Sequence, residues 1–172
     1  MTELIGTKNL DIYGNAELPW SRPLDLLVRD TPTADLAFFL TTVRSDGRPH
    51  TAAVGAVWQD DTLYFVSGPG TLKSRLISGN PHCAVGVRLE GIDLTLEGTA
   101  TRVTDAADLE RLAAVYRSGG WPATVADSAF TAPYSAPSAG PAPWHLYRLS
   151  LRRAVGVAGA EPYGATEWTF AQ

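Results

Sequence analysis

One stretch of the sequence has the residue types and the spacing to bind an anion. Residues 66–75 read VSGPGTLKSR and join a strand-like run to a helix-like run. Two glycines permit a tight turn there, and Thr71 stands where a helix N-cap is expected. Lys73, Ser74 and Arg75 would then fall in the first helical turn, where cations oppose the helix dipole unless an anion binds. The stretch therefore predicts a phosphate site, and a solvated basic helix start is the alternative.

The common nucleotide-binding motifs are not met by this stretch. A P-loop needs Gly directly before its Lys-Ser pair, and this chain has Leu72 at that position. The dinucleotide fingerprint needs a third Gly where this chain has Lys73. The predicted anion site therefore rests on the turn and on the basic helix start.

No other side chains form a self-contained catalytic set. The three histidines, His50, His82 and His145, are far apart in the sequence and lack metal-ligand spacing, so we expect no metal site. Cys83 has apolar neighbours, which indicates a small buried side chain. The Gly-x-Ser-x-Gly nucleophile motif is absent. An anion site without a catalytic dyad is typical of a protein whose cofactor does the chemistry.

The elements that must position this turn are mostly strands. An Asp-Gly turn at residues 45–48 predicts a hairpin, and the small residues 51–56 let a flat ligand approach the backbone. Six to eight mostly antiparallel strands with two or three helices predict a β-rich α+β fold, a small closed or split barrel. The predicted strands are 36–44, 49–58, 62–67, 82–89, 92–104, 144–151, 154–160 and 166–170, and the predicted helices are 24–29, 72–78 and 105–117.

Length and charge narrow the class of protein. The 172 residues suit one domain, residues 1–172, with a substantial core. The 18 acidic and 14 basic residues give a net charge of −4, which argues against nucleic acid as the partner. No apolar run is long enough for a membrane helix, and the N-terminus lacks the apolar region of a signal peptide. We therefore expect a cytoplasmic protein with no membrane partner.

Two segments lie outside the strand-rich centre of the sequence. Residues 1–33 are expected to form an extended arm followed by a short helix, with Ser21 as its N-cap. Residues 121–143 are rich in Pro, Ala and Ser, but they contain aromatic residues that would be unusual in a disordered segment. We expect an ordered loop there. The arm before Trp20 and the loop 121–143 are candidate walls of a substrate pocket.

The ordered set of motifs resembles the pyridoxamine 5′-phosphate oxidase-like family, within it the flavin- and deazaflavin (F420)-dependent oxidoreductases. The resemblance rests on residues 42–50 (TVRSDGRPH), 62–66 (TLYFV), 73–75 (KSR) and 80–81 (NP). It covers residues 36–104 well and residues from 144 onward more loosely. It implies a split β-barrel homodimer with two equivalent cofactor sites at the subunit interface.

Roles for individual residues follow from the resemblance by position. It implies cofactor contacts from two strands and from the basic turn, at His50, Thr51, Ala52, Ala53, Val66, Ser67, Lys73, Ser74 and Arg75. Aromatic residues are the candidates for stacking on substrate, with core packing as the alternative for each tryptophan: Trp58, Trp121, Tyr134 and Trp144. The chain departs from the family at Leu76–Ile77, where Asn-Leu is frequent. The oxidase's C-terminal arginine motif is not evident, which argues against vitamin B6 oxidation.

We therefore expect an oxidoreductase that uses F420, with FMN as the alternative cofactor. It would transfer hydride to or from a small conjugated organic substrate. Two other classes of protein stay open at this point. One is a non-catalytic binding or carrier protein for a flavin- or haem-type ligand. The other is a structural dimer with an empty groove, in which Lys73 and Arg75 are merely solvated.

Overall fold

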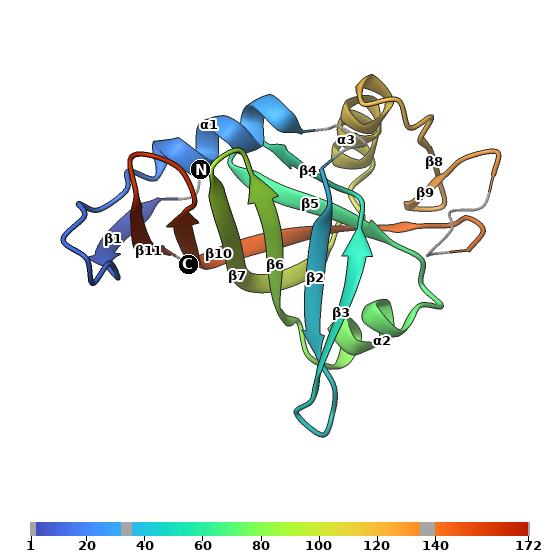
Figure 1. Ribbon diagram of the computed structural model, residues 1–172. Coiled ribbons are helices and arrows are strands. Elements are labelled where there is room, and N and C mark those ends of the chain that lie inside the picture. The colour runs from blue at the N-terminus through green and yellow to red at the C-terminus, as the bar shows by residue number, and fades with distance from the viewer. Residues whose placement is uncertain (1–2, 32–35, 135–139, 172) are drawn as a thin grey trace.

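The computed structural model describes residues 3–31, 36–134 and 140–171. Within these residues the chain forms three helices and eleven strands, and nine of the strands belong to one antiparallel sheet (Figure 1). The helices are α1 (Ser21–Asp30), α2 (Leu72–Gly79) and α3 (Ala106–Ser118). The strands are β1 (Leu4–Asn9), β2 (Phe38–Val43), β3 (Pro49–Val54), β4 (Ala56–Gln59), β5 (Thr62–Ser67), β6 (His82–Leu89), β7 (Ile92–Arg102), β8 (Thr124–Ala126), β9 (Ala129–Thr131), β10 (His145–Ala158) and β11 (Gly164–Phe170). No helix in these ranges is long and apolar enough to cross a membrane.

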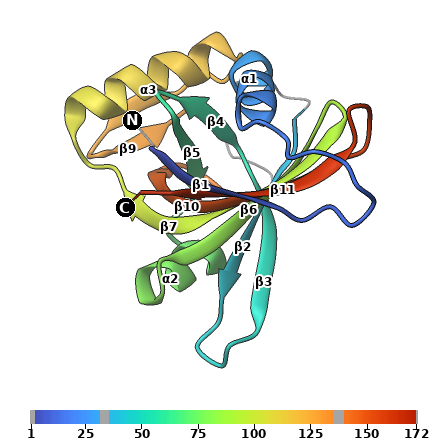
Figure 2. The ribbon, with the colours of Figure 1, turned by 90° about the vertical axis from the view of Figure 1, so that its left-hand side faces the viewer.

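Strand β10 is the place where the sheet divides. One edge of β10 pairs with β7 along most of its length. The other edge pairs first with β5, at residues 145–149, and then with β11, at residues 153–158. The sheet therefore branches at β10, with the barrel strands on one branch and β11 and β1 on the other (Figure 2).

A change of partner at Gly55 brings the ends of the sheet toward each other. Strand β3 pairs with β2, and after Gly55 the chain continues as β4, which pairs with β5. The backbone N–H of Val66 donates to the carbonyl of Gly55 at 3.1 Å, which holds β5 against this bend. Strands β3 and β4 are consecutive in the chain but do not pair with each other. Hydrogen bonding therefore does not close the barrel. The fold is the predicted split β-barrel of the β-rich α+β class.

Two apolar clusters form the core, because the strands alternate buried and exposed side chains. The larger cluster fills the barrel and includes Leu40, Phe65 and Trp168. The smaller one lies under α3 and includes Leu112 and Phe130. In Figure 1, α1 and α3 lie along the upper side of the sheet, and α2 lies by the lower ends of β2 and β3, which it contacts.

The structure matches the predicted bounds of β5 and β6, and it changes several others. The predicted strand 49–58 breaks at Gly55, and the predicted strands 144–151 and 154–160 are one strand, β10, with a bulge between Leu151 and Arg153. The arm contains β1, and the loop contains the β8–β9 hairpin, so the strand count exceeds the expected six to eight. These added strands are short or mostly exposed, and they therefore lack the apolar alternation that reveals a strand in sequence.

The N-terminal segment differs from the prediction at its helix start. Helix α1 includes Ser21, and its N-cap is Trp20, which makes no side-chain capping bond. Ser21 as the N-cap was therefore wrong. Residues 1–2 and 32–33 of the predicted arm and helix, and residues 135–139 of the predicted loop, lie outside the described residues.

We expect Gly98→Ala to destabilise the protein by about 1–3 kcal/mol or more, the usual cost of overpacking a core. A Cβ atom at Gly98 would lie 2.1 Å from the Ser150 carbonyl oxygen on β10, where the bulge brings the two backbones together. Urea denaturation measures the effect. Gly86→Ala on β6 is the control, because a Cβ there meets no atom within 4 Å. An equal effect of both substitutions would contradict this account.

Candidate functional site: an anion-binding turn at the start of helix α2

The turn before α2 is held by its own hydroxyl groups. Thr71 is the N-cap, and its side chain accepts a hydrogen bond from the Ser74 N–H at 3.4 Å. The same hydroxyl donates to the Gly68 carbonyl at 2.8 Å, and it lies 2.9 Å from the Ser67 hydroxyl. The predicted N-cap is confirmed. The first turn of α2 therefore has a defined position relative to the end of β5.

A second hydroxyl pair attaches the helix to the barrel. The Ser74 Oγ donates to the Ser67 Oγ at 2.8 Å, and both side chains are buried. Ile77, one turn further along α2, packs into the core cluster of the barrel. The start of α2 is therefore anchored on two sides, so the residues between these anchors keep a fixed position.

Lys73 comes directly before the Ser74 anchor, and it is a largely buried residue whose cation has no partner among the described residues. Its side chain is only 5% exposed. Among the described residues, no carboxylate pairs with it, and its ammonium makes no hydrogen bond. Burial lowers the pKa of the Lys73 ammonium below its ordinary value. Because buried charges are normally paired, this position suits a bound anion, and the helix N–H groups there favour the same charge.

Arg75 lies on the exposed side of the same turn. Its Nη1 donates to the Gly70 carbonyl at 2.8 Å, which holds the guanidinium beside the turn. A backbone carbonyl carries no net charge, so the positive charge of Arg75 is not neutralised by this bond. The turn thus presents two unpaired cations, one on the largely buried Lys73 and one on the exposed Arg75.

Strand β3 is at the edge of the described sheet, and its residues alternate between two faces. Thr51 and Ala53 are exposed on the outer face, where the Thr51 hydroxyl lies 2.8 Å from that of Thr41. His50 and Ala52 are half-buried on the opposite face, because Ala52 pairs with the fully buried Leu40. A flat ligand that lies on β3 would therefore meet Thr51 and Ala53, or else the free edge of the strand.

The structure brings β3 and the basic turn together. Helix α2 contacts both β2 and β3, and Val66 bonds to the bend that follows β3. Val66 itself is half-buried and packs toward the cluster under α3. The nine residues assigned to the cofactor thus come from three neighbouring elements: β3, the end of β5 and the first turn of α2.

The four aromatic candidates fall into two places. Trp144 is buried, with its ring centroid 5.4 Å from that of Trp121 and 6.5 Å from that of the half-exposed Tyr134. Trp58 instead lies in the barrel core, 6.3 Å from the ring of Trp20. The indole N–H groups of Trp144 and Trp58 have no hydrogen-bond partner among the described residues.

His145 lies beside the turn, although from the sequence we considered it only as a metal ligand. His145, the first residue of β10, is the cross-strand partner of Ser67. It directly follows Trp144 in the chain, and Ser67 in turn bonds to Ser74 on α2. No local signal in the sequence links residues so far apart, because the register of β5 and β10 is a tertiary property.

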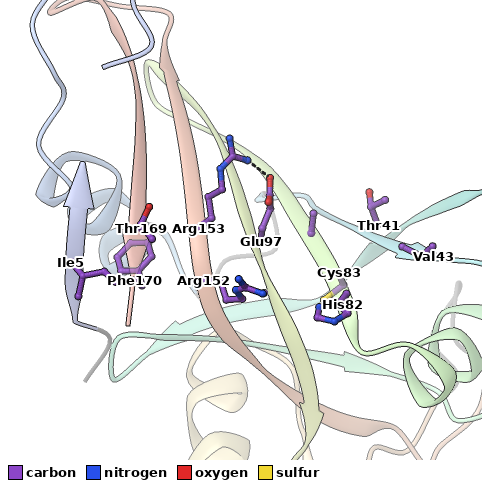
Figure 3. A pocket seen from close by; sticks show the side chains of 12 residues that line it. Ile5, Thr41, Val43, His82, Cys83, Glu97, Arg152, Arg153, Thr169 and Phe170 are labelled. Atoms are coloured by element: carbon purple, nitrogen blue, oxygen red, sulfur yellow. Dashed lines mark hydrogen bonds and ion pairs between the residues drawn. The ribbon is translucent and has the colours of Figure 1, made fainter. Parts of the chain in front are cut away.

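The outer face of the sheet also carries a hollow of about 730 Å³ (Figure 3). Its lining includes Thr41, which joins it to the outer face of β3, and Arg153, which pairs with Glu97 at 2.6 Å. Cys83 also lines this hollow, and burial raises the pKa of its thiol to about 12. The thiol is therefore protonated at neutral pH and inert as a nucleophile.

We expect Lys73→Met to stabilise the ligand-free protein near neutral pH. The pKa of Lys73 is lowered in the folded state, so the buried charge costs stability below the ordinary lysine pKa, and the cost disappears above it. The gain from the substitution should therefore shrink as the pH is raised through that pKa. Thermal unfolding as a function of pH measures this. Lys8→Met is the control, because Lys8 is exposed on β1. A destabilised Lys73→Met protein would show that the ammonium has a partner.

Comparison with solved structures shows the fold of this chain in other proteins. A NimC/NimA family protein from Clostridium acetobutylicum is 15% identical, with 86% of this chain and 91% of that chain covered and a TM-score of 0.57. A pyridoxamine 5′-phosphate oxidase-related, FMN-binding protein from Nostoc punctiforme is 18% identical, with 87% and 90% covered and a TM-score of 0.57. An F420 reductase is 24% identical, with 76% and 93% covered and a TM-score of 0.50.

The sequence itself also matches a family model. No curated protein matches the chain. The model described as pyridoxamine 5′-phosphate oxidase matches residues 27–141, which run from α1 through the barrel and α3 to the loop before β10. The resemblance read from the motifs is confirmed. Because the match spans more than half of the sequence, the chain belongs to the pyridoxamine 5′-phosphate oxidase family.

Proposed function

We propose that this protein is an oxidoreductase that binds a phosphorylated flavin-type cofactor, with Lys73 as the ligand of its phosphate. The observation that carries the proposal is Lys73, a largely buried residue at a helix N-terminus whose ammonium has no partner among the described residues. The solved structures of the same fold include an FMN-binding protein and an F420 reductase. The residues present fit such a group.

Each element around the turn has a part in this proposal. Lys73 and the free N–H groups of α2 hold the phosphate, while Ser67 and Ser74 keep the turn in place. Thr51 and Ala53 offer a flat surface of small side chains for the ring. When bound, the cofactor supplies hydride transfer. The protein supplies binding and orientation, which by themselves account for a large part of such rate enhancements.

The substrate in this proposal is a small conjugated organic molecule. Tyr134 is 47% exposed beside the buried Trp144, which packs against the half-buried Trp121, so this group presents an aromatic surface next to the start of β10. Aromatic rings stack on conjugated molecules. Trp58 is buried in the barrel, so in this proposal it contributes to core packing and does not stack on the substrate.

F420 is the cofactor that we propose first, with FMN as the alternative. F420 adds an acidic tail to the phosphate, so it needs a further cation at the mouth of the site. Arg48 is already paired with Asp46 at 2.8 Å. Arg75 bonds only to a neutral carbonyl at the surface of the turn, so it is the better candidate for the tail.

We propose further that a second copy of the chain covers the outer face of the sheet. Phe39 is 50% exposed there beside Ala53, and Val157 is 49% exposed across a hollow of about 490 Å³ that both residues line. Exposed apolar patches on a sheet face commonly mark protein interfaces. A homodimer formed through this face would place two equivalent sites near the interface.

We expect cofactor-stripped protein to bind F420 or FMN and Lys73→Ala to weaken that binding. The loss of a charge-assisted hydrogen bond costs about 1.5–3 kcal/mol, or about ten- to a hundredfold in affinity. Fluorescence titration with F420 and FMN side by side measures it. Lys8→Ala is the matched control, because Lys8 and Lys73 are the two lysines of the chain.

The outcomes of this titration separate the candidate functions. Tight binding of F420 alone would identify a deazaflavin enzyme, and tight binding of FMN alone a flavin enzyme. Binding without reduction of the cofactor by any donor would instead indicate a carrier protein. If neither cofactor binds, the site formed by β3, the end of β5 and the first turn of α2 has another role, and the proposal fails. Unchanged affinity in Lys73→Ala would remove the phosphate role of Lys73.

We expect Phe39→Asp to convert a dimer into a monomer, because it places a charge in the middle of the proposed apolar interface. Light scattering coupled to gel filtration measures the mass. Val28→Asp is the control, because Val28 is 59% exposed on α1, away from this face. A dimer that survives Phe39→Asp, or a monomeric parent protein, would contradict the proposed interface.

A further inference from the structure

We propose that His145 is a second ligand of the anion bound at the start of α2, and that the anion binds together with a proton taken up by this imidazole. The inference rests on the proposed phosphate site and adds a residue and a pH dependence to it. It concerns a side chain on β10, distant in sequence from the basic turn.

The register of β5 and β10 places His145 beside the turn. His145 and Ser67 are cross-strand partners, and such partners project from the same face of the sheet. The next pair on this face, Phe65 and Tyr147, stacks at a centroid distance of 5.3 Å. Ser67 in turn accepts the hydrogen bond from Ser74 on α2. The imidazole therefore lies at the end of the barrel that the first turn of α2 covers.

The His145 side chain is available for a ligand. It is half-buried, and its imidazole makes no hydrogen bond with the residues that the structure describes. Its ring lies 6.4 Å from that of Tyr147, with the planes tilted rather than stacked. A half-buried neutral imidazole already has one N–H that can donate to an anion, and protonation makes both nitrogen atoms donors and adds a positive charge.

The charge that acts on His145 is positive. It belongs to Arg102 on β7, which is the cross-strand partner of Tyr147. On β5 the facing residue is Ser67, and the next residue on the same face of β10 is Tyr147. Burial first and the charge of Arg102 second lower the pKa of His145 below its ordinary value. The imidazole is therefore neutral at pH 7 in the free protein.

A bound anion reverses this balance. Its negative charge favours the protonated imidazole and raises the pKa of His145 in the complex. Between the lower pKa of the free protein and the higher pKa of the complex, binding takes up a proton. Affinity for the anion should therefore rise as the pH falls through this window. Below the free-protein pKa the imidazole is charged in both states, and the rise should stop.

The first test follows the imidazole directly by NMR. The chain has three histidines, so His50→Gln and His82→Gln assign the signals and leave His145 by exclusion. Adding inorganic phosphate should raise the pKa of His145 by about one unit, equivalent to tenfold tighter binding to the protonated form. His82, exposed on β6, should not shift and is the internal control. An unshifted His145 would overturn the proposal.

The second test compares FMN with riboflavin, which lacks the phosphate, over a pH series from about 5.5 to 8. Wild-type protein should gain about tenfold more affinity for FMN than His145→Gln does as the pH falls, the factor that matches a one-unit pKa shift. The phosphate of free FMN has the same protonation equilibrium in both experiments. A difference in pH dependence between wild-type and His145→Gln protein therefore reports on His145. Riboflavin should show no difference, and His145→Asn repeats the measurement with a second substitution.

The outcomes distinguish this inference from the proposed function. If FMN binds with the same pH dependence in wild type and His145→Gln, the role of His145 is wrong while the Lys73 site stands. If FMN binds neither protein, the proposed cofactor is wrong, and the phosphate titration alone decides whether His145 shares an anion site. A shifted His145 signal in that case still supports the inference.

Discussion

The unpaired charge of the largely buried Lys73 is the constraint on which the rest of the site depends. A lysine that is 5% exposed and has no carboxylate partner among the described residues costs free energy in the folded state. The fold tolerates this cost because α2 is held independently, by the Ser67–Ser74 bond and by Ile77 in the barrel core. A phosphate at the helix N-terminus would remove the cost. The same unpaired lysine would then lower the stability of the free protein and bind the phosphate.

Strand β10 connects this site to everything else in the molecule. Its first residues pair with the end of β5, so they determine what lies beside the basic turn. Its later residues pair with β11, which carries the outer branch of the sheet. The close approach of Gly98 and Ser150 permits the bulge between the two halves. The same strand therefore sets the anion site, the aromatic group that precedes it and the face proposed for the second subunit.

Local patterns in the sequence predicted a large part of this structure. The bounds of β5 and β6, the Thr71 cap and the helix predicted over 105–117, which is α3, follow from short-range alternation, turn residues and capping. The order of these motifs also pointed to the family, which the match over residues 27–141 confirms. Strands β1 and β8 were not predicted, because they are short and mostly exposed and therefore lack apolar alternation. The pairing of β1 is also set by β11, far away in the sequence.

The sequence alone determined that this chain has a basic turn at a helix start, a strand of small residues and a family to which both belong. Only the tertiary structure decided that Lys73 is buried without a partner, that Thr51 and Ala53 face outward while His50 and Ala52 do not, and that Trp58 lies apart from Trp144. It also placed His145 beside Ser67. Burial, strand register and the change of partner at Gly55 depend on contacts between distant segments, which no local pattern encodes.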